Sequence, residues 1–436
     1  MYSKGVATVR AIRIACLAVV ISCSGDPTAP AVTHVTAPDI PISGAAVPGL
    51  EPFEQSVRNM MQTYGIPGGA VALVRDGKLI YARGFGYADL ENKTPVQPDA
   101  LFRIASVSKP ITSAAIMKLV EQGKLKLDDR VAPLIADLTP APGATVDPRW
   151  EQITIRHLLD HTGGWDRDKP NGGFDPIDRP LIAAAAVGAP APASSETLVR
   201  YMKGMPLDFN PGEKFAYSNF GYIILGRVIE RLSGMKYEQF VRERVLQPVG
   251  ASRTQQSKSL MRNALAEEVK YYMPGVGLNA ALTQSVFPGE GVVPINYGGY
   301  HLEAGDASGA WVSSTIDLLR FVNGVDGRAS PPDILTPQLI TDMTSNGATT
   351  CADGSCYYAG GWNVRPVESG ATWWHGGDLP GTKSMLVRSY YDNISWVALF
   401  NAGAPPKFNG QLDTALWTAL AGVTSFPTQD LFSTFR

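Results

Sequence analysis

Strand-like patterns lie at both ends of this 436-residue chain, and a helical, loop-rich middle separates them. Near the N-terminus, residues 68–89 form two apolar runs joined at Asp76-Gly77, a dipeptide favoured in hairpin turns. The C-terminal third has further apolar or aromatic runs, separated by turn residues, at 357–366, 372–375, 384–390 and 394–401. Because short strands at the two ends need partners, we expect one antiparallel sheet of about five strands, or slightly more, built from both ends.

Amphipathic patterns flank these strands and predict a first and a last helix that cover the sheet. The apolar residues at helical spacing are Phe53, Val57, Met60 and Tyr64 near the start, and Leu412, Leu416, Ala419 and Leu420 near the end. The middle, about 136–300, would form an inserted and mostly helical lobe. We therefore expect an α+β fold, with a sheet flanked by the N- and C-terminal helices and a second, helical lobe.

The N-terminus has the features of an export signal. Basic residues within the first 13 positions precede an apolar run at 14–21 that is too short to span a bilayer. Val20-Ile21-Ser22-Cys23 resembles a lipobox, in which Cys23 is lipidated and becomes the mature N-terminus; a plain secretory signal is the alternative. We expect a signal peptide, a disordered spacer rich in Pro, Thr and Ala, and a folded domain, with bounds 1–22, 23–50 and 51–436.

A single lipid group would hold the protein at a membrane surface without spanning it. We expect a protein exported to the bacterial cell envelope and anchored there at the periplasmic face, or else periplasmic or secreted. The formal net charge of −2 includes no basic block of the kind that binds nucleic acid.

Cys351 and Cys356 are the two cysteines outside the N-terminal segment. In an oxidising compartment they could close a small loop as a disulfide. A metal pair and two free thiols are the alternatives. The sequence has no second Cys/His cluster nearby, and this argues against metal.

Two Ser-x-x-Lys pairs occur in the chain. Ser106 directly precedes an apolar helical pattern, so Lys109 lies one turn away and can reach its hydroxyl. Ser233 stands where a predicted helix ends, and Lys236 lies beyond that end. A lysine takes a proton from serine at neutral pH only if burial or a nearby cation lowers its pKa, ordinarily about 10.4. Ser106 and Lys109 are therefore the candidate nucleophile and base.

Two further stretches stand where a site would be expected. Tyr217-Ser218-Asn219 lies in a loop directly before a helical run, and His375-Gly376-Gly377-Asp378 ends a predicted strand. Glycines at a strand end let a substrate approach the sheet edge closely. Other polar residues are interpreted as structural, namely the turn Tyr391-Asp392-Asn393 and the histidines His157, His161 and His301.

S-V-S-K, Y-S-N and H-G-G, in this order and at these separations, resemble the motifs of the serine β-lactamase-like superfamily. The chain is most similar to the branch of class C β-lactamases, family VIII esterases and D-amino-acid peptidases, over about 51–423. H-L-L-D-H-T-G-G and W-V-S-S-T-I-D-L-L-R-F support this resemblance. The third motif departs from it, because the chain has no Lys-Thr-Gly. A neutral histidine binds a carboxylate less strongly than an ammonium does, which favours esterase- or peptidase-like members.

The resemblance implies a role for each motif residue. Ser106 is the implied nucleophile, Lys109 its proton acceptor, and Tyr217 the proton shuttle. The residues implied to contact substrate are Asn219, His375 and Gly377, with the backbone N–H groups of Ser106 and Asp378 as the oxyanion hole.

We expect a serine hydrolase that forms an acyl-enzyme on Ser106 and acts on a small ester, amide or D-amino-acid peptide, without a cofactor or metal. A cell-wall D,D-carboxypeptidase or a class C-type β-lactamase is the alternative. A non-enzymatic alternative is a peptidoglycan-binding module, although the intact Ser106, Lys109 and Tyr217 argue against it. Loops at 165–180 and 289–309 would shape the pocket, and they carry no readable pattern.

Overall fold

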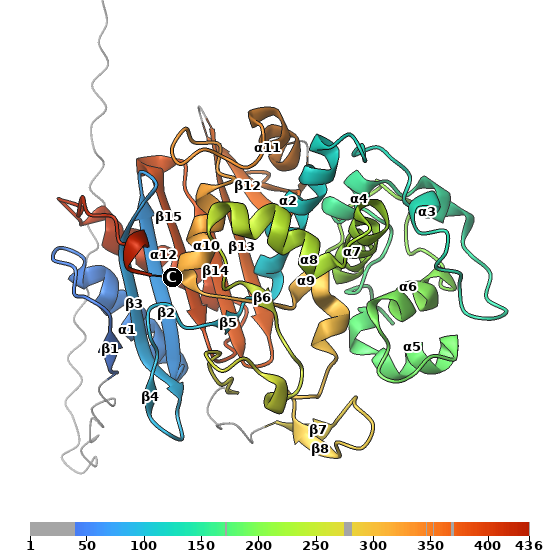
Figure 1. Ribbon diagram of the computed structural model, residues 1–436, viewed down its shortest axis with the longest axis horizontal. Coiled ribbons are helices and arrows are strands. Elements are labelled where there is room, and N and C mark those ends of the chain that lie inside the picture. Colours follow the sequence, from blue (N-terminus) through green and yellow to red (C-terminus); the bar gives the residue numbers. More distant parts are fainter. Residues whose placement is uncertain are drawn as a thin grey trace, which may run out of the picture. The chain divides into compact units, whose positions relative to one another are not determined.

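An antiparallel sheet stands at the centre of the fold, and both ends of the chain supply its strands (Figure 1). The structure, a computed structural model, describes residues 40–435 except 171, 274–280, 346, 352, 368 and 369. Within these residues the order of the main path is β1-β3-β2-β15-β14-β13-β12-β11-β10, with β4 beside β3. The bounds are β1 Ile42–Ser43, β2 Gly68–Arg75, β3 Lys78–Asp89, β4 Thr94–Pro95, β10 Ala348–Thr349, β11 Tyr357–Ala359, β12 Trp362–Val367, β13 Gly370–Leu379, β14 Thr382–Arg388 and β15 Ile394–Phe400.

The pairing of β2 with β15 joins the two ends of the chain. Their register runs from Gly69 opposite Phe400 to Arg75 opposite Ile394. The β2–β3 hairpin turns at Asp76-Gly77 with φ of 51° and 75°, the left-handed backbone that such a turn requires. The predicted antiparallel sheet, built from both ends, is therefore confirmed.

Alternate residues of β2 face two different layers. Val71 and Leu73 pack against α1 (Glu51–Tyr64) and α12 (Phe408–Ala421) in one apolar cluster. Ala72 and Val74 belong to a second cluster on the opposite face, with α2 (Ser108–Glu121) and α10 (Thr315–Asn323). The first and last helices thus cover one face of the sheet, as the sequence predicts. The buried stripe of α1 uses Met61 instead of the predicted Met60.

The middle of the chain contributes mostly helices, on the side of the sheet that α2 occupies (Figure 1). They are α3 Val131–Leu134, α4 Ile155–Leu159, α5 Pro180–Val187, α6 Ser195–Lys203, α7 Asn219–Ser233, α8 Tyr237–Val241 and α9 Asp306–Gly309, followed by α11 Pro337–Thr344. Short strands accompany them as β5 Phe102–Arg103, β9 Trp311–Ser313 and β6 Gln255–Gln256 in one small sheet, and β7 Leu282–Gln284 with β8 Val292–Pro294 in another. Among the described residues, no helix is both long and apolar enough to cross a bilayer.

Residues 40–50 are part of the folded domain. Ile42 pairs with Phe85 of β3, and the side chains of Val47 and Leu50 are buried. The prediction of a disordered spacer up to residue 50 is therefore wrong for this stretch. Its apolar residues belong to the apolar cluster that α1 and α12 form with the sheet. Cys23 and the predicted signal peptide lie outside the described residues.

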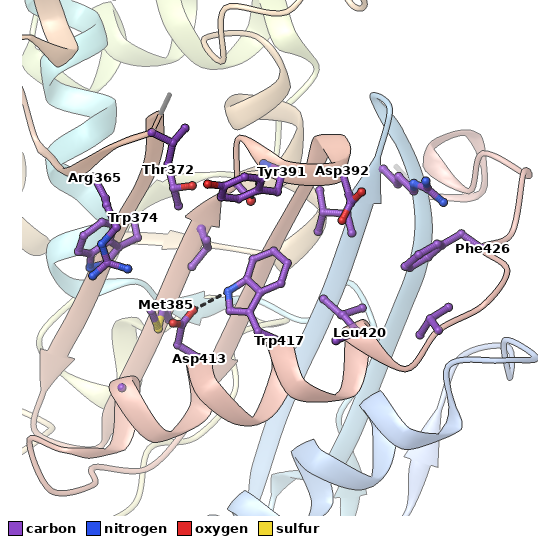
Figure 2. A pocket seen from close by; sticks show the side chains of 18 of the residues that line it. Arg365, Thr372, Trp374, Met385, Tyr391, Asp392, Asp413, Trp417, Leu420 and Phe426 are labelled. Carbon is purple, nitrogen blue, oxygen red and sulfur yellow. Dashed lines mark hydrogen bonds between the residues drawn. The ribbon is translucent and has the colours of Figure 1, made fainter. Parts of the chain in front are cut away.

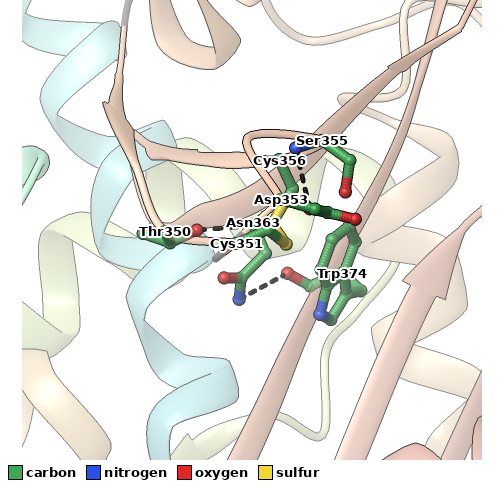
Figure 3. Close-up of a disulfide and its surroundings, with 7 residues drawn as sticks. All are labelled: Thr350, Cys351, Asp353, Ser355, Cys356, Asn363 and Trp374. Carbon is green, nitrogen blue, oxygen red and sulfur yellow. Dashed lines mark hydrogen bonds between the residues drawn. A yellow bond between two sulfur atoms is a disulfide. The ribbon is translucent and has the colours of Figure 1, made fainter.

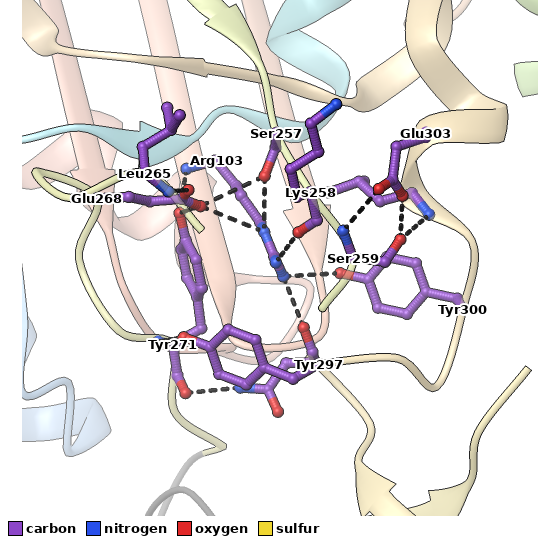
Figure 4. A network of polar contacts seen from close by, with 12 residues as sticks. Arg103, Ser257, Lys258, Ser259, Leu265, Glu268, Tyr271, Tyr297, Tyr300 and Glu303 are labelled. Atoms are coloured by element: carbon purple, nitrogen blue, oxygen red, sulfur yellow. Dashed lines mark hydrogen bonds and ion pairs between the residues drawn. The ribbon is translucent and has the colours of Figure 1, made fainter. Parts of the chain in front are cut away.

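A buried arginine holds the segment that leads to Ser106 (Figure 4). The guanidinium of Arg103, in β5, lies 3.6 Å from a carboxylate oxygen of Glu268 and 4.4 Å from the ring centroid of Tyr271. It also donates hydrogen bonds to Ser257 Oγ and to the backbone carbonyls of Lys258 and Asn296. A buried charge needs such partners, so this network fixes β5 to the loop that surrounds it.

Cys351 and Cys356 form a disulfide, with 5.1 Å between their Cα atoms (Figure 3). The bond closes the turn between β10 and β11, where the backbone N–H of Cys351 donates to the carbonyl of Cys356. The described residues contain no group of side chains suited to hold a metal ion.

Candidate active site

Ser106 lies in a tight turn directly before α2. The turn is a 3₁₀ segment, Ala105–Val107, and Ser108 Oγ donates to the carbonyl of Ala105 at 2.6 Å. Ala105 has φ of 48°, a left-handed conformation that costs a residue with a Cβ about 1–3 kcal/mol. Strain of this kind persists where surrounding contacts hold the backbone in place. In this turn Ser106 is half-buried, whereas Lys109 is fully buried.

The amine of Lys109 has three oxygen neighbours. Nζ lies 3.1 Å from Ser106 Oγ, 2.7 Å from Asn219 Oδ1 and 2.7 Å from the backbone carbonyl of Ser308. The first contact spans one helical turn, as the Ser-x-x-Lys spacing predicts. The other two come from α7 and α9, which pack on α2.

Burial lowers the pKa of Lys109 well below its ordinary value. The guanidinium of Arg167 lowers this pKa further, whereas the carboxylate of Asp175 acts in the opposite direction. Desolvation disfavours the charged form of an amine, so the shift is in the direction that a lysine base near neutral pH requires.

Tyr217 completes a hydrogen-bonded group around the serine. Its hydroxyl donates to Ser106 Oγ at 2.8 Å. The residue stands two positions before α7, and the N-cap Ser218 accepts from Gly221 N–H. Burial raises the pKa of Tyr217, so its hydroxyl keeps the proton that it donates.

His161 supports this tyrosine from behind. Its ring centroid lies 4.3 Å from that of Tyr217 and 4.5 Å from that of Tyr358. Its Nδ1 accepts the backbone N–H of Ser218 at 3.2 Å. Burial, followed by the nearby Lys109, lowers the pKa of His161 well below its ordinary value, which suits a neutral acceptor. The interpretation of His161 as a structural residue agrees with these contacts.

The third motif lies beside the serine turn. A Cβ added to Gly377 would stand 2.5 Å from the carbonyl oxygen of Ile104 and 2.9 Å from Ala105 Cβ, so only glycine permits this approach. The motif occupies the end of β13, which stops at Leu379, one position after Asp378. The register of β12 on β13 stops at Trp374, so within the described residues the following stretch of β13 has a strand partner on one side only.

His375 does not present its ring to an open surface, because only 3% of the residue is exposed. Its Nε2 lies 3.0 Å from the hydroxyl of Tyr358, and its Nδ1 lies 2.7 Å from the carbonyl of Gly376. Burial, with a smaller effect of Lys109, lowers the pKa of His375 to about 3, so the ring is neutral. The ring lies on the Ser106 side of β13, with its centroid 6.4 Å from that of Tyr217, but it is buried, and its contact with substrate stays a prediction.

Sequence reasoning missed three residues of the site. Arg167 lies 4.8 Å above the ring of Tyr217, Asp175 accepts from the side chain of Asn219, and the Ser308 carbonyl accepts from Lys109. Arg167 and Asp175 lie in the 165–180 loop, where no pattern was readable. The one local signal was Asp175-Pro176, an N-cap followed by proline, which begins a short 3₁₀ segment.

A separate cavity lies away from this site. It has a volume of about 870 Å³ and lies between α12 and the sheet (Figure 2). Trp374 and Gly376 line it, whereas His375 and Gly377 alternate with them and face Ser106. The cavity therefore opens on the opposite face of β13 and is separate from the candidate active site.

The sequence model of the beta-lactamase family matches residues 53–421. The chain belongs to the beta-lactamase family. The predicted resemblance is thereby confirmed, and all three motifs lie inside the matched range. Penicillin-binding protein 4* of Bacillus subtilis is 29% identical over 342 residues, which cover 74% of this chain and 66% of that protein. The first curated relatives are thus longer, and the chain spans just under two thirds of their length.

Two further similarities concern sequence and fold. Esterase EstB of Burkholderia gladioli is 37% identical over 199 residues, covering 45% of this chain and 48% of the esterase. The octameric penicillin-binding protein homologue from Pyrococcus abyssi superposes with a TM-score of 0.65, at 24% identity, over 87% of this chain and 79% of that one. This second likeness concerns the fold alone and agrees with the predicted fold class.

Proposed function

We propose that this beta-lactamase family member is a serine hydrolase that forms an acyl-enzyme on Ser106. The observation that carries the proposal is the set of neighbours of Lys109 Nζ. A neutral amine has two N–H donors and one lone pair, and the oxygens of Asn219 and Ser308 can only accept. Both N–H groups are therefore used, which leaves the lone pair for the hydroxyl proton of Ser106.

Acylation follows from this arrangement. Ser106 donates its proton to Lys109 Nζ as Oγ attacks the carbonyl carbon of the substrate. Tyr217, already hydrogen-bonded to Oγ, lies where it can pass a proton to the leaving atom and recover one from the Lys109 ammonium. The backbone N–H groups of Ser106 and Asp378 would hold the oxyanion, and water would release the acyl group by the reverse proton transfers.

A small ester or an amide, including a D-amino-acid peptide, is the proposed substrate class. The third motif supplies no cation toward the serine, because His375 is neutral and buried. A substrate carboxylate would therefore gain little electrostatic binding energy beside the third motif, which weighs against a β-lactam as substrate. The likeness to an esterase supports the same choice. A D,D-carboxypeptidase or β-lactamase is the second candidate, and the penicillin-binding relative favours it. A peptidoglycan-binding module is the non-enzymatic alternative.

We also propose that the protein is exported and held at the cell envelope by a lipid on Cys23. The proposal rests on the basic start, the short apolar run and the lipobox-like Val20-Ile21-Ser22-Cys23. Expression in a bacterium, with fractionation of the wild type and Cys23→Ser, tests it. Loss of the protein from the membrane fraction in the variant is the expected result, and equal membrane retention would contradict it.

Intact mass after incubation with a fluorophosphonate, and separately with a penicillin, tests the enzymatic proposal. A fluorophosphonate adduct that is absent in Ser106→Ala is expected, together with turnover of a p-nitrophenyl ester. A long-lived penicillin adduct would favour the peptidase, and rapid penicillin hydrolysis would favour a β-lactamase. Folded protein without any adduct would refute hydrolysis at Ser106 and leave the binding module.

A further inference from the structure

Asp175 is a buried carboxylate one residue away from the catalytic group. Its side chain is 3% exposed. Oδ2 accepts a hydrogen bond from Asn219 Nδ2 at 2.8 Å, and the guanidinium of Arg167 lies 3.7 Å from the same oxygen. Oδ1 accepts the backbone N–H of Ile177 at 3.4 Å, in the turn that Asp175 caps. Asp175 touches neither Ser106 nor Lys109, yet it contacts the residue that lies between them and the loop.

The carboxylate decides which way the Asn219 amide points. An ionised carboxylate only accepts hydrogen bonds, whereas a side-chain amide has a donor end and an acceptor end. With Asp175 beside it, the amide must turn Nδ2 toward the carboxylate, and Oδ1 then faces Lys109 Nζ at 2.7 Å. Rotation of the amide by about half a turn would place two acceptors together and bring Nδ2 to the lysine.

The orientation of this amide matters because it determines where the lysine lone pair points. With Oδ1 toward Lys109, an N–H of the amine is used on Asn219 and the lone pair remains for Ser106. With Nδ2 toward Lys109, the amide would donate to the lone pair and compete with the serine proton. The residue that holds the Asn219 amide in this orientation therefore also determines where the lone pair of Lys109 points.

We infer that Asp175 is a positioning residue, which holds the Asn219 amide so that the lone pair of Lys109 points at Ser106. The inference rests on the proposed function of Ser106 and Lys109. It assigns a role in catalysis to the 165–180 loop, which carries no recognisable motif.

A purely electrostatic role of Asp175 has to be separated from this positioning role. The titratable and charged groups that face Lys109 and Asp175 are Arg167, Asp178, His161, His375, Tyr217 and Tyr222. Removing the negative charge of Asp175 would alter the field at Lys109 even if the Asn219 amide kept its orientation. Asp178 is exposed on the same 3₁₀ segment and, among the described residues, is not hydrogen-bonded to Asn219, so it provides a matched charge control.

The test compares Asp175→Leu, Asp175→Asn and Asp178→Asn by the rate of fluorophosphonate labelling as a function of pH, with melting temperature as a check of folding. Asp175→Leu removes the acceptor, and we expect its maximal labelling rate to fall about 10²-fold, within the range that general-base catalysis contributes. Asp175→Asn loses the charge but keeps an oxygen where two donors, Asn219 and Arg167, point. It should label within about 10-fold of the wild type, and Asp178→Asn should match the wild type.

A double-mutant cycle with Asn219→Ala completes the test, since only an effect exerted through Asn219 vanishes in that background. Asp175→Leu should slow labelling in the wild type and not in Asn219→Ala. Equal slowing in both backgrounds would overturn the inference. An equal displacement of the pH profile in both Asp175 variants, with the maximal labelling rate unchanged, would overturn it too and indicate an effect of charge alone. Failure of the wild type to label at Ser106 would instead refute the proposed function.

Discussion

Replacement of Gly377 by alanine should slow acylation without unfolding the protein. The new Cβ would lie 2.5 Å from the Ile104 carbonyl oxygen and 2.9 Å from Ala105 Cβ. Ordinary contacts begin at 3.4 Å, so the backbone before Ser106 must retreat by 3.4 − 2.5 = 0.9 Å and 3.4 − 2.9 = 0.5 Å. The Oγ of Ser384 would also collide with the new Cβ, rotate away and lose its hydrogen bond to Ile104.

A shift of about 1 Å in a reacting group can cost 10²-fold in rate, and overpacking costs about 1–3 kcal/mol of stability. We therefore expect kcat for a p-nitrophenyl ester to fall about 10²-fold, while the melting temperature drops by only a few degrees. Gly376→Ala is the matched control, because its Cβ would meet the side chain of Asn409 on the opposite face of β13. A wild-type kcat in Gly377→Ala, or an equal loss in both variants, would refute this reasoning.

Three other changes separate stability from catalysis. Arg103→Met leaves the Glu268 carboxylate buried without its cation, so the free energy of unfolding in guanidinium chloride should fall by about 3–5 kcal/mol, and an unchanged denaturation midpoint would contradict the network. Tyr217→Phe removes the 2.8 Å donor to Ser106 and should lower kcat by about 10²–10⁴-fold with little change in KM; a rise confined to KM would argue for a binding role instead. Lys109 binds fewer protons in the folded state than in the unfolded state, because burial lowers its pKa, so its contribution to unfolding free energy increases with pH up to about 10.4. Lys109→Met should accordingly raise the melting temperature at pH 7 and reduce its increase from pH 7 to 10, and a lower melting temperature at pH 7 would show that the buried amine stabilises the fold.

Features that depend on short stretches of sequence were predictable. The β2–β3 hairpin follows from Asp76-Gly77 between two apolar runs, and the contact of Lys109 with Ser106 follows from helical spacing. The placement of Tyr217 was predictable because this residue directly precedes Ser218, the N-cap of α7, and its position is restricted accordingly.

Features that depend on contacts between residues far apart in the sequence could not be predicted. Asp175 meets Asn219 across 44 residues, and Ser308 meets Lys109 across 199, with no periodic pattern to mark either contact. β1 is only two residues long, so it carries no alternation that distinguishes a strand from a spacer. Which face of β13 His375 occupies could be anticipated from alternation, but its burial depends on Tyr358, 17 residues away.

The contact between Ser384 and Ile104 spans 280 residues, and it bears on biosynthesis. A ribosome synthesises a chain from the N-terminus, so N-terminal segments emerge first. The serine, lysine and tyrosine of this protein emerge long before β13 and β14, against which the serine turn packs. A nascent chain therefore carries all three side chains before it has the strand that forms one wall of the site. The candidate active site is therefore completed only late in synthesis, when β13 and β14 have joined the sheet.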